Sequence, residues 1–104
     1  MKCFNMLIMI LSAAAIFNSR ERVKDCRFEG QNLYGRVKVV NSFPDFRVKV
    51  VNSFPDLKVM TVESFPDRCG RWKFVDSHED FTVKFVDSHE DFSIKYVTAF
   101  PGMP

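Results

Sequence analysis

The sequence predicts an all-β domain, built as a compact solenoid or ring of about seven strand-turn repeats. Three observations predict this fold. A unit of 11 residues recurs in tandem, apolar and polar residues alternate in the first half of each unit, and turn-forming residues fill the second half. Because a single unit cannot bury its own apolar face, the units must pack on one another.

Six copies of the unit are clear. They read RVKVVNSFPDF from Arg36, RVKVVNSFPDL from Arg47, KVMTVESFPD from Lys58, RWKFVDSHEDF from Arg71, TVKFVDSHEDF from Thr82 and SIKYVTAFPG from Ser93. Cys69-Gly70 forms an extra step between the third and fourth copies, and DCRFEGQNLYG from Asp25 fits the same frame as a degenerate seventh unit.

The first half of each unit predicts a strand with one buried face. Positions two and four are apolar in nearly every copy, and position three between them is usually lysine, as in Val37-Lys38-Val39. Trp72 occupies position two, so we expect it in the core and not in a ligand site. Valine at position five interrupts the alternation, so the strand bends there or is covered on both sides.

The second half of each unit predicts a turn. Its residues hydrogen-bond their own backbone, and proline fixes φ. Pro44, Pro55, Pro66 and Pro101 recur at a spacing that excludes a continuous helix, although an 11-residue period would otherwise allow one. We expect the lysines at position three and the aspartates at position ten to form charged surface rows that keep the protein monomeric.

The first 19 residues have the features of a signal peptide. Lys2 precedes an apolar run that ends near Phe17, and small residues supply a cleavage site between Ala15 and Ser19. An uncleaved anchor is the alternative, but the run is short for a bilayer. We therefore expect a secreted or periplasmic β-repeat domain over 24–104, with no membrane span after cleavage.

Charge and cysteine content agree with an exported domain. A mature chain from Arg20 keeps 14 of the 15 basic and all 13 acidic side chains, a balance that gives no electrostatic reason to bind nucleic acid. Cys3 leaves with the signal peptide, so Cys26 and Cys69 remain as a pair. A disulfide is the first interpretation in an oxidising compartment, and two buried thiols are the alternative.

The repeats resemble those of the septoil knot family, which are small, often secreted bacterial domains of uncharacterised role. Lys84-Phe85-Val86-Asp87-Ser88-His89-Glu90-Asp91 and the equivalent segments carry the resemblance, which extends from about Lys24 to the C-terminus. The sequence departs from the family pattern at Phe-Pro and at the two histidines. The resemblance implies that seven units wind twice around an axis as a torus knot, with neighbours three to four units apart. That spacing would suit the Cys26–Cys69 pair.

Two copies of Asp-Ser-His-Glu-Asp suggest either catalysis or metal binding. They contain the residue types of a catalytic triad, but neighbours on an extended chain point to opposite faces, so we expect no enzyme and no cofactor. If adjacent units stack, His78 and His89 with Asp76 and Asp87 could bind zinc, copper or nickel. Against this, phenylalanine fills the histidine position elsewhere, and the family's winding would separate consecutive units.

The remaining candidate is a rim of phenylalanines in the turns. Phe43, Phe54 and Phe65, each beside a proline, could project outward as a stiff apolar surface for a protein or cell-surface partner. The sequence therefore predicts a non-enzymatic structural or interaction module, with a divalent-metal-binding module as the alternative.

Overall fold

The computed structural model describes residues 22–104, and the predicted signal peptide lies outside this range. Every regular element in the described range is a strand, as the sequence predicts. The strands are β1 (Arg27–Phe28), β2 (Gln31–Asn32), β3 (Gly35–Val39), β4 (Phe46–Val50), β5 (Leu57–Thr61), β6 (Arg71–Phe74), β7 (Phe81–Phe85) and β8 (Phe92–Tyr96). The same residues contain no helix long and apolar enough to cross a bilayer.

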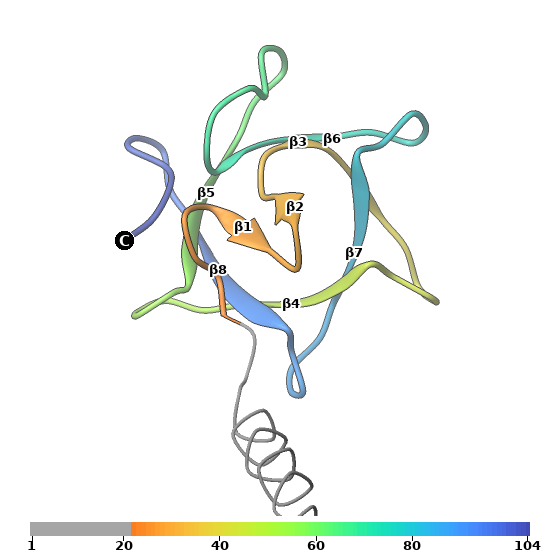
Figure 1. Ribbon diagram of the computed structural model, residues 1–104, viewed down its shortest axis with the longest axis horizontal. Coiled ribbons are helices and arrows are strands. Elements are labelled where there is room, and N and C mark those ends of the chain that lie inside the picture. Colours follow the sequence, from red (N-terminus) through yellow and green to blue (C-terminus); the bar gives the residue numbers. More distant parts are fainter. Residues whose placement is uncertain (1–21) are drawn as a thin grey trace, which may run out of the picture.

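Strands β3 to β8 close into a barrel in the order β3-β6-β5-β8-β4-β7, and every pair in it is parallel. Consecutive strands usually lie side by side in proteins, but here only β5 and β6 do. Viewed down the barrel, the strands run around the ring with the turns projecting outward between them (Figure 1). Of the predicted solenoid or ring, the ring is confirmed as a closed barrel, and the units that lie side by side in it are mostly not consecutive.

The chain passes around the ring twice. Strands β3 to β5 make the first pass, and β6 to β8 fill the gaps that it leaves. Each strand of the second pass spans two strands of the first: Val83 of β7 pairs with Val39 of β3 on one side and with Phe46 of β4 on the other. The two passes are thus joined along their whole length by main-chain hydrogen bonds between residues far apart in sequence.

The two additional residues Cys69 and Gly70 lengthen the β5–β6 connection and change the order of the strands in the barrel. Every other connection skips one strand of the barrel, but the connection from β5 to β6 moves to the adjacent place. Because the barrel has an even number of strands, skipping one strand every time would return the chain to an occupied place. The longer connection shifts the second pass by one place, so that its strands fall between those of the first.

Two layers of side chains fill the barrel. Position two of each unit is fully buried, and the residue just before position one is buried as well. The larger members of these layers are Val37, Phe46, Val48, Leu57, Val59, Trp72, Phe81, Val83, Phe92 and Ile94. Trp72 is therefore a core residue, as the sequence predicts. The prediction fails at position four, where Val39, Phe74 and Tyr96 remain 38–47% exposed because the strands end there.

The aspartates at position ten are exposed, as the predicted surface row requires, and four of them also accept backbone hydrogen bonds. Asp91 Oδ2 accepts a hydrogen bond of 2.7 Å from the backbone N–H of Arg47, and the Asp91 N–H donates to the Arg47 carbonyl at 2.7 Å. Asp80 makes the same pair of bonds with Arg36. Asp45 and Asp56 accept from Thr82 and Ser93 N–H groups at 2.8 and 2.9 Å. These carboxylates fasten one pass of the chain to the other.

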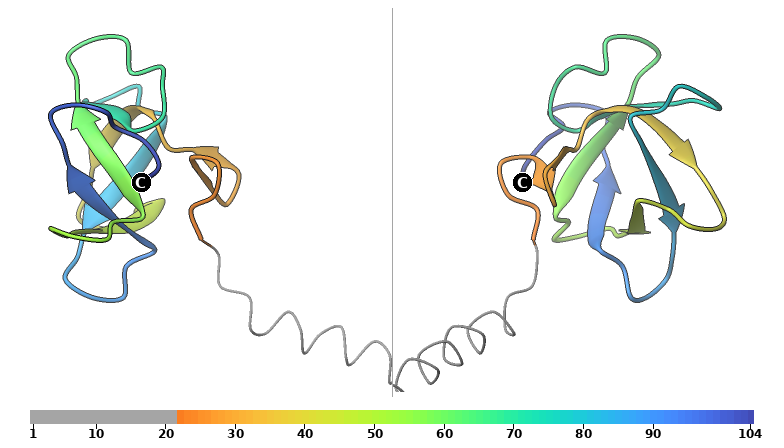
Figure 2. Two further views of the ribbon diagram at one scale, coloured as in Figure 1. Left: turned by 90° about the vertical axis from the view of Figure 1, so that its left-hand side faces the viewer. Right: turned by 45° about the vertical axis from the view of Figure 1, so that its right-hand side comes forward.

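The degenerate N-terminal unit forms no barrel strand. Its segment folds into the antiparallel β1–β2 hairpin, which lies over one end of the barrel (Figure 2). Phe28 packs against Phe46 and Phe92 with ring centroids 5.5 and 5.4 Å apart. The Trp72 Nε1–H donates to the Leu33 carbonyl at 3.1 Å.

The predicted disulfide is confirmed. Cys26 in the hairpin and Cys69 in the β5–β6 connection are bonded, with their Cα atoms 5.8 Å apart. The disulfide, together with Phe28 and Leu33, holds the hairpin on the barrel.

Candidate functional site

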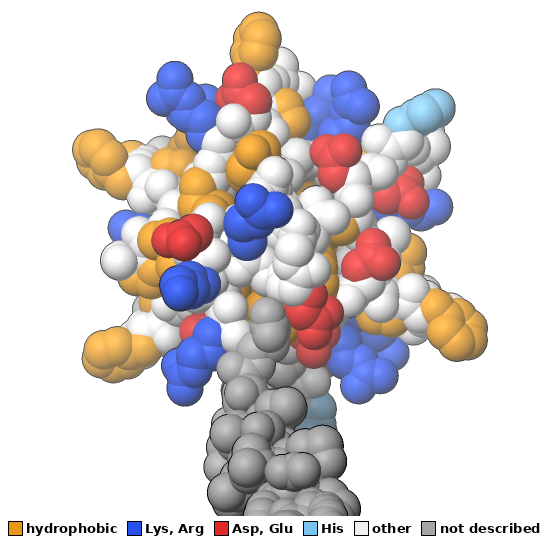
Figure 3. Space-filling view, in the orientation of Figure 1, with side chains coloured by type: hydrophobic (Ala, Val, Ile, Leu, Met, Phe, Trp, Pro, Cys, Tyr) orange, Lys and Arg blue, Asp and Glu red, His pale blue; other side chains and the backbone are white. Residues whose placement is uncertain are grey.

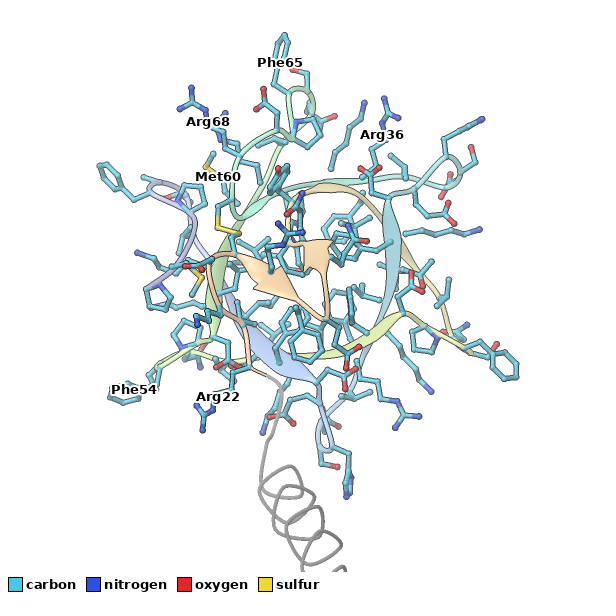
Figure 4. All side chains as sticks on the ribbon, in the orientation of Figure 1. Arg22, Arg36, Phe54, Met60, Phe65 and Arg68 are labelled. Atoms are coloured by element: carbon cyan, nitrogen blue, oxygen red, sulfur yellow. A yellow bond between two sulfur atoms is a disulfide. The ribbon has the colours of Figure 1, made fainter. Side chains whose placement is uncertain are left out.

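The turn tips are the most unusual feature of the surface. The side chains of Phe43, Phe54, Phe65 and Phe100 are 96%, 95%, 74% and 85% exposed. Figure 4 shows Phe54 and Phe65 pointing directly away from the ring. Large apolar side chains exposed to this degree contribute almost nothing to the core. Their positions therefore need an explanation other than packing.

These four positions, and the equivalent His78 and His89 in the other two turns, adopt left-handed backbone conformations. Their φ values lie between 52° and 62°, and the residues are Phe43, Phe54, Phe65, His78, His89 and Phe100. Glycine or asparagine suits this region, whereas a residue with a bulky Cβ substituent costs about 1–2 kcal/mol there. Exposure and backbone strain thus coincide at each phenylalanine tip.

Each turn is hydrogen-bonded to a neighbouring strand at its first end, and among the described residues every turn except that of Phe65 is also bonded at its second end. The N–H of the position-five valine donates to the carbonyl of a position-two residue in a neighbouring strand, as Val40 does to Val83 at 2.9 Å. At the other end, Asp45 N–H donates to Thr82 Oγ1 at 2.8 Å. The other five position-five valines make the same bond at 2.8–2.9 Å: Val51, Val62, Val75, Val86 and Val97. The tips are therefore carried on short, anchored turns.

The order of the tips around the ring differs from their order in the sequence, because most connections skip a strand. Following the turns around Figure 1, the tips are His78, Phe65, Phe100, Phe54, His89 and Phe43. Phe54, Phe65 and Phe100 are therefore consecutive, and we call them the aromatic arc. Phe43 stands alone between the two histidine-bearing turns.

Those two turns, 75–80 and 86–91, are the acidic turns, since each contains two aspartates and a glutamate. Figure 3 shows the apolar tips of the aromatic arc at the top and left of the outline and an exposed histidine at the upper right. The Phe65 turn carries Glu63 and Asp67 as well as Arg68, and Arg47 and Lys84 line the groove beside His89. Carboxylates are therefore densest in the two acidic turns, while basic side chains occur all around the rim.

The structure does not bring the predicted metal ligands together. His78 and Asp76 lie in one acidic turn, His89 and Asp87 lie in the other, and the Phe43 turn stands between them. Each imidazole instead contacts its own turn, with Nδ1 3.2 Å from the hydroxyl of the preceding serine, Ser77 or Ser88. Within residues 22–104 no three His, Cys, Asp or Glu side chains are grouped so as to hold a metal ion.

An open groove runs between neighbouring turns. It is lined by Asn41, Ser42, Phe43, Pro44, Arg47, Lys84, His89 and Asp91. Its walls carry both signs of charge, positive from Arg47 and Lys84 and negative from Asp91.

The repeat pattern and the interleaved strands agree with one protein family. The family model described as the 7(1) septoil knot domain matches residues 30–104, which is most of the chain. The chain belongs to the septoil knot family. No curated protein matches the chain.

The strand ends of this septoil knot domain are partly apolar. The position-four residues there are half-exposed, and we call them the annulus: Val39, Val50, Phe74, Phe85 and Tyr96. Desolvation raises the pKa of the Tyr96 phenol above its usual 10.0. The annulus is more buried than any phenylalanine tip, which makes the tips the more prominent surface.

Sequence reasoning found Phe43, Phe54 and Phe65 but left Phe100 out of the rim. Phe100 occupies position eight of its unit, as the other three do, so the repeat frame could have identified it. The division of the rim into an aromatic arc and an acidic side has no such signal. It depends on which turns become neighbours when the second pass fills the gaps of the first.

Proposed function

We propose that this septoil knot domain is an exported, non-enzymatic interaction module that binds protein partners through its phenylalanine tips. One observation carries the proposal: large apolar residues occupy strained, left-handed, almost fully exposed positions. A turn selected only for stability would have glycine or asparagine there. Strained residues tend to persist where function requires them.

Stiffness supports a binding role. Proline follows each phenylalanine tip, and the turns of Phe43, Phe54 and Phe100 are hydrogen-bonded to neighbouring strands at both ends. A partner that binds such a tip immobilises few additional rotatable bonds, so the entropic cost of binding is low. The Cys26–Cys69 disulfide is consistent with an oxidising compartment outside the cytoplasm.

We further propose that the two passes of the chain form the torus knot for which the family is named. The N-terminal segment would be the seventh unit, which caps the barrel mouth instead of entering its wall. Two features support this: the alternation of first-pass and second-pass strands, and the hairpin that follows the same repeat frame. In this arrangement the fold is a rigid hub that displays the turns.

Metal binding stays a prediction without a supporting observation, because His78 and His89 lie in separate turns. A thermal melt with zinc, copper or nickel would test it. A saturable rise in Tm that disappears in a double His→Ala variant would establish binding to the folded state.

The interaction function is tested by capture from the exported protein fraction of the producing cell. Immobilised wild-type chain is compared with a variant carrying Phe→Ser at Phe43, Phe54, Phe65 and Phe100. The variant should keep the fold, since the four side chains are exposed, and this is checked by its melting curve. Proteins retained by the wild type and lost from the variant support the proposal. Equal retention by both would contradict it.

A further inference from the structure

A pocket of about 440 Å³ lies where the repeat is interrupted, between the hairpin and the β5–β6 connection. Its polar lining comes from separate parts of the chain. The hairpin and the residues after it supply Gln31, Asn32 and Tyr34, the β5–β6 connection supplies Asp67, and the turn before β7 supplies Asp80. The volume falls in the range of small-molecule sites, about 300–1,000 Å³.

Asp67 is the position-ten aspartate that the barrel does not use. Each of the other four accepts a hydrogen bond from the strand that its own connection skips: Asp45 from β7, Asp56 from β8, Asp80 from β3 and Asp91 from β4. The β5–β6 connection skips no strand, and within residues 22–104 Asp67 accepts no backbone N–H. Its carboxylate lines the pocket instead, where it can accept hydrogen bonds from a ligand.

The walls of the pocket are fixed before a ligand binds. The Cys26–Cys69 disulfide ties the hairpin to the β5–β6 connection, two residues after Asp67. Asp80 is held by a hydrogen bond of 2.8 Å from a backbone N–H of β3. Gly35 leaves the space that this carboxylate occupies, since a Cβ at that position would overlap Asp80 Oδ2. A site held in this way loses little entropy when a ligand binds.

The chemistry of the lining matches a neutral saccharide. The carboxylates of Asp67 and Asp80 only accept hydrogen bonds, whereas the amides of Gln31 and Asn32 both donate and accept. Sugar hydroxyls also do both, but an ammonium group only donates and cannot pair with the amide N–H groups. Tyr34, which packs against the core, adds an aromatic ring and a hydroxyl. Among the described residues no lysine or arginine lines the pocket, so an anion would meet the carboxylates without a counter-charge.

From these observations we propose that the pocket binds a sugar residue of a neutral glycan, whose hydroxyl groups donate to Asp67 and Asp80. The proposal goes beyond the proposed function, because no phenylalanine tip lines this pocket. It assigns a role to the one place where the hairpin, the disulfide and the lengthened connection meet.

Titration of the mature full-length chain with methyl glycosides of glucose, galactose, mannose and N-acetylglucosamine tests the proposal. NMR follows the backbone amides of Asn32, Tyr34 and Asp67, which should shift saturably with at least one glycoside. Asp67→Ala should raise the dissociation constant at least about fivefold. Asp87→Ala removes the same charge outside the pocket and should change the constant less than twofold. Both aspartates are exposed, so both variants should keep the fold, which melting curves check.

Three results would overturn the saccharide site: no saturable shift with any of the glycosides, an equal effect of Asp67→Ala and Asp87→Ala, or tighter binding of methylammonium than of every glycoside. The last result would make the pocket a cation site. The capture experiment is separate from this test, because its four phenylalanine substitutions leave the pocket lining unchanged apart from the neighbour of Pro66. A chain that binds no glycoside but still captures proteins through its tips would disprove the saccharide site and leave the proposed function standing.

Discussion

At the scale of single residues, the phenylalanine tips do not stabilise the isolated domain. Phe54 is 95% exposed with φ near 53°, so its ring gains little from burial while its backbone is strained. Asparagine is several times more frequent in this region than other non-glycine residues, because its short side chain hydrogen-bonds locally. Phenylalanine at this position therefore lowers the free energy of unfolding of the isolated domain relative to asparagine.

Replacing Phe54 with asparagine should stabilise the isolated domain. We expect the free energy of unfolding to rise by about 1 kcal/mol, since the left-handed conformation becomes easier to adopt. Denaturant titration measures the change. Phe43→Asn provides the matched control, because the two units are identical over ten residues and should respond alike. A loss of stability at both sites would show that the ring packs in a way the exposure does not indicate.

The hydrogen bonds accepted by the position-ten aspartates should also contribute to stability. Asp91→Ala removes the acceptor of the 2.7 Å bond from Arg47 N–H, which should lower the free energy of unfolding by about 1–2 kcal/mol. Asp67→Ala is the control, because Asp67 has the same repeat position but accepts no backbone N–H in the part of the chain described. Thermal melts of the two variants should differ clearly, and equal losses would contradict the role given to Asp91.

At the scale of elements, the hairpin is the one unit of the described chain that forms no strand of the barrel. It is tied to the barrel by Phe28, by Leu33 and by the Cys26–Cys69 disulfide, which joins residues 43 apart in sequence. Because Trp72 donates to the Leu33 carbonyl, the indole reports on whether the hairpin stays in place.

Replacing both Cys26 and Cys69 with serine should lower the free energy of unfolding by about 2–5 kcal/mol, the usual effect of losing a native disulfide in a small domain. Trp72 fluorescence should also shift toward the value for a solvated indole at denaturant concentrations where the barrel strands remain folded. Circular dichroism measured on the same samples follows the strands. Coincident transitions by both probes would mean that hairpin and barrel unfold as one unit.

Much of each element could be predicted from the residues themselves, whereas the arrangement of the elements could be predicted only through the family resemblance. The neighbours three to four units apart that it implies are found for every barrel pair except β5–β6. Alternation located the strands, proline and serine located the turns, and position two located Trp72 in the core. The neighbours of each strand had no local signal, because identical units carry identical patterns. Phe43 and Phe54 lie in units with the same ten residues, yet one tip stands between acidic turns and the other beside Phe100.

At the scale of the whole molecule, almost all structure is non-local. Val39 pairs with Val83 and Arg47 with Lys84, so each barrel contact closes a long loop of chain. Closing such loops costs entropy before the hydrogen bonds of the ladder are gained, which slows folding. The interleaving also means that no strand of the second pass can leave without breaking contacts with two strands of the first.

This architecture predicts slow unfolding of the mature chain. After a jump into moderate denaturant, loss of the circular dichroism signal should take minutes or longer, because the transition state must separate both passes together. Refolding should also be slow and should accelerate when the disulfide is kept intact, since Cys26–Cys69 already closes a loop between the hairpin and the β5–β6 connection.

Proline isomerisation is the competing source of a slow phase, because Pro44, Pro55, Pro66 and Pro101 all lie in turns. A double-jump experiment separates the two causes. Chains unfolded only briefly keep their native proline isomers, so they should still refold slowly if threading of the second pass limits the rate. Fast refolding after a brief unfolding pulse, or unfolding complete within seconds, would argue against a threaded chain and leave a barrel whose two passes separate freely.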